Sequence, residues 1–345
     1  MDLRALLWLL VACIFHASAL TLLTPRWSRD FFQEQRCDGF ALAAFRGKSR
    51  ASPGLVISGH GGSSTRAIQE MVTEVGSHFF GAIDPETHDS LVTRWANVTD
   101  IQSEIFAKAR QTDYDLSSIP QDLRAATTDD VCRSVLILDS MQEQSDADHG
   151  VSMSWALKEP WLRFVFPFFD DVVGPSGYKF VHVTRDIRSI HQRESETNRL
   201  PLPDKPEWGA QFNALASEAN RRFPALEVTA KQVAFLAEFA HTWALTETRL
   251  KHWWETQRAD QYFHISERNF ATPEQARGVS ARLVSFLGVQ SLPSEKLEKM
   301  SFMFKPNAET DDSWHLMNMI INLKDMVVVR DALREFGYGT GIRQK

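Results

Sequence analysis

Short apolar runs alternate with longer amphipathic stretches along the chain. Four runs have the length and the β-branched or aromatic content typical of strands: 54–58 (GLVIS), 134–139 (SVLILD), 178–184 (YKFVHVT) and 262–266 (YFHIS). Because they are apolar at consecutive positions, both faces of each strand would be buried, as in a parallel sheet covered by helices. The pattern therefore predicts an α/β fold with a parallel β-sheet flanked by helices.

The clearest helical periodicity lies in the second half of the chain. Residues 229–255 place Val233, Leu236 and Trp243 on one stripe, and such a stripe is typical of a helix packed on a core. Residues 273–288 begin with a proline in the first turn and stop at a glycine, as helix ends prefer. A last helix is expected to end near Gly337.

Composition limits the kinds of partner. Of 345 residues, 43% are hydrophobic and 24% are charged, which is ordinary for a globular protein. The formal net charge of −6 argues against nucleic acid as a partner, because the overall field would repel a polyanion. Any anion site must therefore be local. No metal site is predicted.

The N-terminal segment predicts entry into the secretory pathway. Residues 1–19 combine Arg4, an apolar stretch and the small-x-small pattern Ala17-Ser18-Ala19, as signal peptides do. If it is not cleaved, the segment 5–23 is long enough to act as a membrane anchor. In both cases the body of the protein would be in the Golgi lumen or secreted.

The remaining chain is interpreted as a lead-in, 20–53, and a single domain, 54–345. Residues 198–228, with four prolines, are expected to form an insertion or a lid-like segment. Cys37 and Cys132 either form one disulfide in an oxidising compartment or are two unrelated buried thiols. The sequence Asn97-Val98-Thr99 is a glycosylation sequon.

The first apolar run leads into the sequence GHGGSSTR, residues 59–66. A strand, a glycine-rich turn and a helix together aim backbone N–H groups and the positive helix end at one point, which suits phosphate or sulfate. The hydroxyls of Ser63, Ser64 and Thr65 and the charge of Arg66 would add to such a cradle. The alternative is a glycine-rich connection with capping serines and no ligand. Neither the dinucleotide fingerprint nor the Walker A pattern is present.

Two further segments carry candidate charges. Arg185-Asp186 directly follows the run 178–184, and the carboxyl ends of parallel strands form the ligand-binding side of α/β sheets. The alternative is a surface salt bridge. Lys158-Glu159-Pro160 precedes a strongly apolar, helix-like run. Lys158 is either a point charge for a transferring group or a solvated lysine before a helix.

In their order along the chain, these segments resemble the sulfotransferase family. The segment 57–66 resembles its 5′-phosphosulfate loop, 156–160 its Lys-Asp/Glu-Pro element, 180–190 its 3′-phosphate motif, and 262–289 its late Tyr-Glu-x-Leu…Pro…Phe-Leu-Gly segment. The resemblance implies a P-loop-like three-layer sandwich. It also implies transfer of a sulfuryl group from 3′-phosphoadenosine 5′-phosphosulfate (PAPS) to a hydroxyl of a carbohydrate, a protein tyrosine or a small alcohol.

The resemblance also implies roles for individual residues. The 5′-phosphosulfate would be held by the loop residues Gly61, Gly62, Ser63, Ser64, Thr65 and Arg66. The 3′-phosphate would be held by Arg185, with Arg193 where the family has a serine. Lys158 or Arg66 would neutralise the developing charge. Candidates for the base that takes the acceptor proton are Asp84, His88 and Asp89.

The loop departs from the family pattern in three places. Gly62 stands where most members carry a basic residue, Ser64 replaces a glycine, and Arg66 replaces a threonine. The loop of this chain is more similar to that of one branch of the family, in which the loop reads Gly-Gly-Ser-Gly-Thr-Arg. Three other functions stay open: a catalytically silent protein that binds the desulfated product PAP, a P-loop-type nucleotide phosphotransferase and a membrane-tethered structural protein.

Overall fold

The computed structural model describes residues 37–47, 52–60, 63–81, 83–84, 89–92, 119–149, 153–160, 162–190, 202–304 and 311–339. The expected signal or anchor and the sequon at Asn97 lie outside these ranges. Among the described helices, none combines the length and the apolar content needed to cross a membrane.

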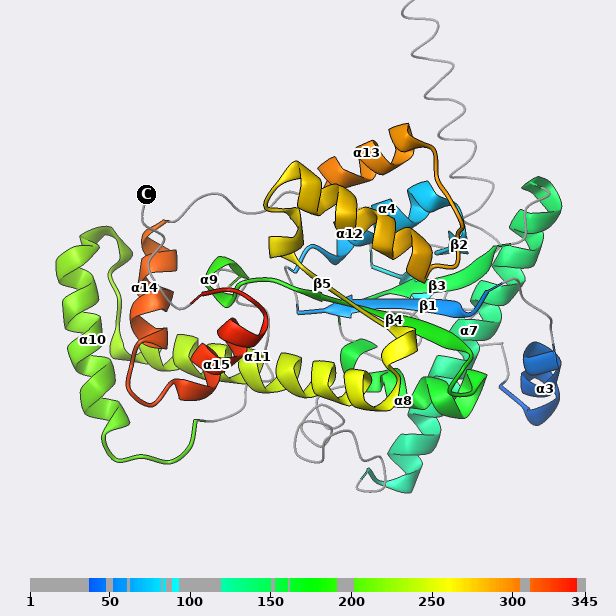
Figure 1. Cartoon of the computed structure of the whole chain (residues 1–345). Helices are drawn as coiled ribbons and strands as arrows, with labels where there is room; N and C mark the ends of the chain where they lie inside the picture. Colours follow the sequence, from blue (N-terminus) through cyan, green and yellow to red (C-terminus); the bar gives the residue numbers. More distant parts are fainter. Residues whose placement is uncertain are drawn as a thin grey trace, which may run out of the picture.

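A parallel sheet forms the centre of the described chain (Figure 1). Its strands are β1 (Gly54–Gly59), β2 (His78–Phe79), β3 (Ser154–Lys158), β4 (Tyr178–Thr184) and β5 (Tyr262–Ser266), in the order β2-β3-β1-β4-β5. All neighbouring strands pair in parallel. The predicted α/β fold is therefore confirmed, as are three of the four predicted strands.

The fourth predicted strand, 134–139, is wrong. These residues lie in the middle of α7, a helix that spans Gln121–His149. The buried residues Val131, Val135 and Leu138 are spaced three and four apart, so they form one helical stripe that packs against α8. The local preference of β-branched residues for strands was outweighed by this packing. The strands that the sequence pattern missed, β2 and β3, have two and five residues.

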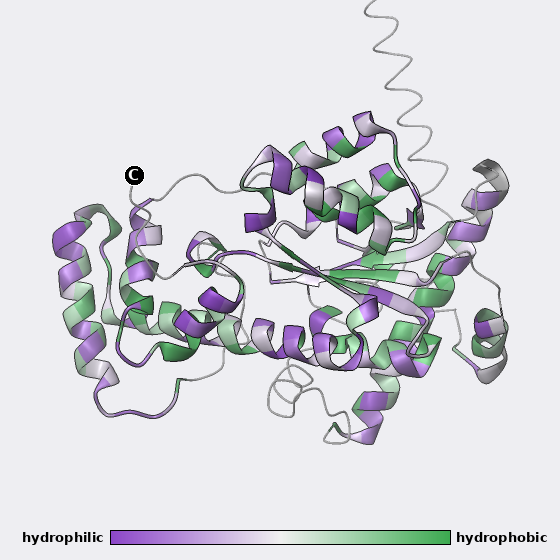
Figure 2. Ribbon diagram, in the orientation of Figure 1, coloured by the Kyte–Doolittle hydropathy of each residue, from purple (hydrophilic) through white to green (hydrophobic). Residues whose placement is uncertain are grey.

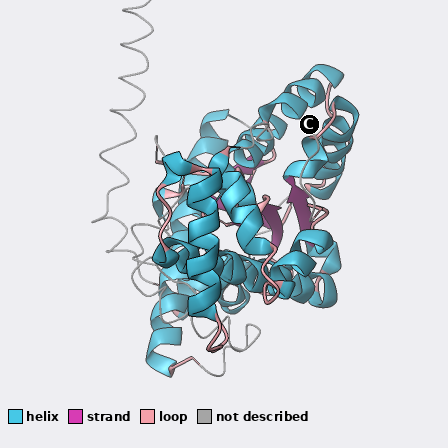
Figure 3. Cartoon of the chain, turned by 90° about the vertical axis from the view of Figure 1, so that its left-hand side faces the viewer, coloured by secondary structure: helices cyan, strands magenta, loops and turns pink. Residues whose placement is uncertain are grey.

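Helices cover both faces of the sheet (Figures 1 and 3). On one face lie α4 (Thr65–Val75) and α12 (Pro273–Phe286), with α13 (Ser294–Met303) packed on both. On the other lie α8 (Leu162–Val173) and α11 (Ala230–Gln257), with α7 packed on α8. The predicted helices 229–255 and 273–288 correspond to α11 and α12. In Figure 2 these covering helices are amphipathic, with hydrophobic residues concentrated towards the sheet.

A second group of helices lies beyond the carboxyl ends of the strands (Figure 1). It contains α9 (Ile187–Ile190), α10 (Trp208–Arg222), α14 (Asp312–Ile321) and α15 (Val327–Glu335), packed around the first half of α11. Within the segment expected to be an insertion or lid, α10 buries Phe212, Leu215 and Ala219 in this group. Three short 3-10 turns complete the described chain: Pro224–Leu226, Ala259–Gln261 and Glu267–Phe270.

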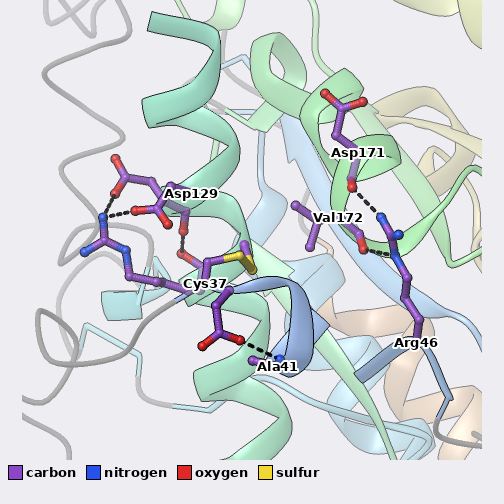
Figure 4. The surroundings of a disulfide bond; sticks show 11 residues. Cys37, Ala41, Arg46, Asp129, Asp171 and Val172 are labelled. Carbon is purple, nitrogen blue, oxygen red and sulfur yellow. Dashed lines mark hydrogen bonds and ion pairs between the residues drawn. A yellow bond between two sulfur atoms is a disulfide. The ribbon is translucent and has the colours of Figure 1, made fainter. Parts of the chain in front are cut away.

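A disulfide fixes the N-terminal helix α3 (Gly39–Gly47) to α7 (Figure 4). It joins Cys37 to Cys132, whose Cα atoms are 5.8 Å apart, a separation ordinary for a disulfide. Arg46, at the other end of α3, donates hydrogen bonds to the carbonyl oxygens of Asp171 and Val172 in α8. Of the two alternatives for the cysteines, the structure has the disulfide.

Candidate active site

Four segments that carry polar side chains meet at one edge of the sheet. Each directly follows the carboxyl end of a strand: the glycine-rich loop after β1, Glu159 after β3, Arg185 after β4 and Glu267 after β5. Because the strands are parallel and adjacent, these segments lie side by side. The central strand β1 is also where the strand order reverses, and ligands bind at this position in open α/β sheets.

The loop after β1 begins in close contact with the next strand. Gly59 pairs with Val183, and a Cβ atom on it would lie 2.0 Å from the Val183 carbonyl oxygen. Residues 61 and 62 lie outside the described chain, so the predicted roles of Gly61 and Gly62 stay predictions. The backbone N–H of Ser63 donates to the His60 carbonyl oxygen, 2.9 Å away.

Ser64 precedes α4 in the left-handed conformation, with φ 67° and ψ 29°. This conformation favours glycine, and glycine is the residue that the family pattern has at this position. The loop therefore has a backbone conformation suited to glycine at residue 64, and the serine at this position adds a hydroxyl. Thr65 begins α4 and is buried, whereas the side chain of Arg66 is exposed.

The Ser63 hydroxyl is fully buried and has no hydrogen-bond partner in the described parts of the chain. Buried hydroxyls normally have a partner. A donor at this place, next to the N-terminus of α4, fits an anionic ligand. The residues present are therefore compatible with a phosphosulfate group.

Arg185 joins the loop to the end of β5. Its Nη1 donates to the Ser64 Oγ at 3.0 Å and its Nε donates to Glu267 Oε2 at 3.0 Å. Burial raises the pKa of the Glu267 carboxyl, an effect that the ion pair with Arg185 opposes. The two predicted anion-binding segments, around Ser64 and Arg185, are thus in direct contact.

The other arginine of the Arg-Asp-x-Arg motif has a different environment. Arg188 is buried and donates from Nε to Asp186 Oδ1 at 2.8 Å and from Nη2 to the Gly339 carbonyl oxygen at 2.9 Å. It holds the C-terminal segment against α9. The alternative for Arg185, a surface salt bridge with Asp186 or a neighbour, is not what the structure has: Arg185 pairs with Glu267 and Asp186 with Arg188, and all four side chains are buried. Arg193 lies outside the described residues.

Lys158 is the last residue of β3 and not a solvated lysine before a helix. It pairs with Ile57 of β1, is only 3% exposed, and forms an ion pair with Asp89. The backbone N–H of Ser90 donates to the Lys158 carbonyl oxygen at 3.0 Å. Two of the predicted catalytic residues, Lys158 and Asp89, are therefore in contact at the carboxyl end of β3, the strand next to β1.

Asp84 lies beside the same segment. Its backbone N–H donates to the Asp89 carbonyl oxygen at 2.9 Å, and Ile83 forms an antiparallel bridge with Ser90. His88, the third candidate for the base, lies outside the described residues.

Several polar residues near the loops were missed by the sequence pattern. They are His60, Arg163, His182, Glu247 and Glu267, and all of them are buried. His60 and Glu267 had a signal in the sequence, since each directly follows an apolar strand. Arg163 and Glu247 lie within apolar helical stretches, where a charge is ordinarily read as pointing towards solvent.

No family model and no curated protein matches the chain. Solved structures similar to it are sulfotransferases, the family that the four sequence segments resemble. Sulfotransferase STF9 from Mycobacterium avium is 12% identical, with a TM-score of 0.45 over 86% of this chain and 80% of that chain. The sulfotransferase domain of the Synechococcus PCC 7002 olefin synthase is 13% identical, with a TM-score of 0.40 over 84% and 96%. Sulfotransferase STF1 from Mycobacterium tuberculosis H37Rv is also 13% identical, with a TM-score of 0.36 over 84% and 77%.

Proposed function

We propose that the chain is a PAPS-dependent sulfotransferase that acts on a hydroxyl acceptor. One observation carries the proposal: the Arg185 guanidinium is hydrogen-bonded to Ser64 at the N-terminus of α4. The groups assigned to the 3′-phosphate and to the 5′-phosphosulfate thus belong to a single site at the carboxyl edge of the sheet.

The residues of this site have complementary roles in binding. The hydroxyls of Ser63 and Ser64 and the first-turn N–H groups of α4 would hold the 5′-phosphosulfate, as helix N-termini hold anions. Arg185 would hold the 3′-phosphate, and its bond to Glu267 keeps the guanidinium in one orientation. Arg66, exposed in the first turn of α4, would add further positive charge.

The transfer step requires charge stabilisation and a proton acceptor. The acceptor oxygen forms a bond to sulfur, the bond between sulfur and the bridging phosphate oxygen breaks, and PAP leaves with that electron pair. The acceptor proton goes to a carboxylate, for which Asp89 is the best-placed described residue. Lys158, paired with Asp89, supplies positive charge near the leaving oxygen, where Gly62 brings none.

The first test is calorimetric titration with PAP. The wild type is expected to bind PAP, and the variant Arg185→Met/Glu267→Gln is expected to bind it about 10- to 100-fold more weakly, because a hydrogen bond to a charged group contributes about 1.5–3 kcal/mol. Changing both partners avoids leaving a buried carboxylate without its cation. The matched control is Arg258→Met/Asp170→Asn, which removes another arginine–carboxylate pair, near the amino end of β4. No PAP binding by the wild type, or equal binding by both double variants, would contradict the proposal.

One observation favours the silent PAP-binding protein as a second candidate. Lys158 is already paired with Asp89, so its charge is partly compensated. Lys158→Ala separates the candidates when transfer from labelled PAPS is measured: an enzyme loses transfer and keeps PAP binding. Wild-type protein that binds PAP and transfers nothing to any acceptor of a broad panel is the silent protein. Magnesium-dependent turnover of ATP in place of PAPS would indicate the phosphotransferase.

The acceptor and the compartment follow as part of the same proposal. We assign the protein to the lumen of the secretory pathway, since the Cys37–Cys132 disulfide suits an oxidising compartment. A glycan, a protein tyrosine or a small alcohol would then be the acceptor. Labelled PAPS tested against glycan, peptide and phenol panels distinguishes these classes.

A further inference from the structure

A buried ion pair lies beneath the loops of the site. Arg163 of α8 and Glu247 of α11 are both fully buried, and the Arg163 Nε lies 3.6 Å from Glu247 Oε1. Glu247 Oε2 is 2.5 Å from His182 Nε2 of β4. Burial by itself raises the pKa of Glu247, but its neighbours His182, Arg163 and His60 outweigh burial and lower it. An ionised carboxylate therefore faces the guanidinium inside the core.

The other end of Arg163 holds two main-chain carbonyl groups. Its Nη1 donates to the Gly59 carbonyl oxygen at 2.6 Å and to the Pro160 carbonyl oxygen at 3.2 Å. Gly59 is the last residue of β1 before the glycine-rich loop, and Pro160 follows Lys158-Glu159. The side chain thus bridges the two loops that would hold the phosphosulfate and the lysine.

Ser58 forms a second bridge between the same two loops. The Arg163 backbone N–H donates to Ser58 Oγ at 2.9 Å, and that hydroxyl is within 2.9 Å of the Glu159 carbonyl oxygen and 2.8 Å of the Pro160 carbonyl oxygen. The carbonyl groups at the ends of strands have left the sheet ladder and need donors from elsewhere. Arg163 supplies a donor to the Gly59 and Pro160 carbonyl oxygens, and Ser58 supplies one to the Glu159 and Pro160 carbonyl oxygens.

This arrangement is not explained by stability alone. A buried ion pair contributes little net stability, and apolar side chains of similar volume often serve as well. The other face of the same sheet is closed by aliphatic residues. What an apolar side chain lacks is a donor that reaches the Gly59 and Pro160 carbonyl oxygens while a second nitrogen of the same group faces Glu247.

We propose that Arg163, oriented by Glu247, is a positioning residue of the site. It fixes the start of the loop after β1 relative to Lys158-Glu159-Pro160, so that the sulfuryl group and the lysine meet in a constant geometry. The identity of the ligand in this inference rests on the proposed function; the link between the loops does not.

The test uses the full chain with both charges removed. The variant Arg163→Met/Glu247→Gln leaves no buried charge without a partner, and its control is again Arg258→Met/Asp170→Asn. Hydrogen–deuterium exchange is measured for peptides covering residues 58–66 and 158–164, with thermal unfolding and PAP titration in parallel. In the Arg163 variant we expect about tenfold faster exchange in both peptides and about tenfold weaker PAP binding. Neither change is expected in the control. The thermal stability of the Arg163 variant should be no lower than that of the control.

Arg163→Lys sharpens the test, because it keeps the charge but has one nitrogen, which cannot replace both the Nε near Glu247 and the Nη1 that bonds the two loop carbonyl groups. It is expected to keep stability near that of the wild type and to show the faster exchange. Exchange equal to the control in both Arg163 variants would overturn the inference. If the wild type does not bind PAP, the proposed function fails, and the exchange comparison alone still decides whether Arg163 links the loops.

Discussion

The two faces of the sheet are closed by different chemistry. Towards α4 and α12, the strands present Leu55, Ile57, Val181, Val183 and Ile265, and the covering helices meet them with aliphatic residues. Towards α8 and α11, the strands present Val56 and Phe180 in their first half. Nearer the carboxyl ends, this second face presents Ser58, His182 and Thr184 instead.

The difference follows the position of the loops. Arg163 and Glu247 enter only on the face towards α8 and α11, directly beneath the turns after β1 and β3. An aliphatic face holds helices to a sheet through area burial, which has no direction. A polar face holds specific carbonyl groups in place, because hydrogen bonds have direction. We infer that the first face stabilises the fold and that the second fixes the geometry of the site.

The largest expected effect comes from breaking the ion pair on one side only. Arg163→Met should lower the free energy of unfolding by about 3–5 kcal/mol, because Glu247 is left as a buried charge without its cation. Leu55→Ala, the comparison on the aliphatic face, should cost about 2–5 kcal/mol through lost burial and a cavity. Urea unfolding measures both.

A second substitution, Glu247→Gln, distinguishes the two faces further. Adding Glu247→Gln to Arg163→Met should recover most of the lost stability, whereas the same addition to Leu55→Ala should recover none. If Arg163→Met alone costs less than about 1 kcal/mol, Glu247 is not a buried charge that depends on Arg163.

An intermediate effect is expected from pH. His264 of β5 lies on the polar face, with Nε2 2.8 Å from the Thr184 Oγ1. Its pKa is well below the usual value, because burial disfavours the imidazolium and because His182 and Lys251 add positive charge nearby. The folded state therefore binds fewer protons than the unfolded state, so stability is lost as the pH falls below about 6.5.

His264→Gln should make this loss shallower by at most about 1.4 kcal/mol per pH unit. The difference between the two unfolding profiles from pH 7 to pH 5 isolates the effect, because the other shifted groups, such as His78, whose pKa burial lowers to about 4, are the same in both proteins. Leu55→Ala should keep the wild-type pH dependence. If the stability of the wild type and that of His264→Gln fall equally with pH, His264 does not cause the loss.

The smallest effect is expected at Ser64, where the loop meets α4. Ser64→Gly relieves a left-handed conformation that costs an L-residue roughly 1–2 kcal/mol, but it loses the hydrogen bond from the charged Arg185, worth about 1.5–3 kcal/mol. Ser64→Ala loses the bond and keeps the strain. The glycine variant should therefore be more stable than the alanine variant by about 1 kcal/mol in thermal unfolding. The opposite order would mean that the left-handed conformation at residue 64 is absent in solution.

Much of the fold could be read from the sequence because its signals are local. The strands beginning at Gly54, Tyr178 and Tyr262 are apolar on both faces, and α12 begins at a proline. The segment 134–139 was misread because its four apolar residues in a row, 135–138, are compatible with either period. Val131 and Met141 extend the apolar stripe on both sides with helical spacing, and they identify the segment as part of a helix.

The candidate site was predicted in part for the same reason. Ser64, Lys158 and Arg185 each stand at the end of an apolar strand, so their position relative to the sheet edge follows from local pattern. Their partners do not: Asp89 is 69 residues from Lys158, and Glu267 is 82 residues from Arg185. No periodicity along one chain encodes such pairings.

By itself the sequence determined the class of fold and the edge at which charged side chains gather, since both depend on the alternation of apolar strands with helices. Only the tertiary structure decided that the Arg185 guanidinium contacts the loop after β1 and that Lys158 forms an ion pair with Asp89. It also placed Arg163 beneath the loops and against Glu247. The reason is physical: a charge inside the core is tolerated only where distant segments bring it a partner, and a linear pattern does not show that meeting.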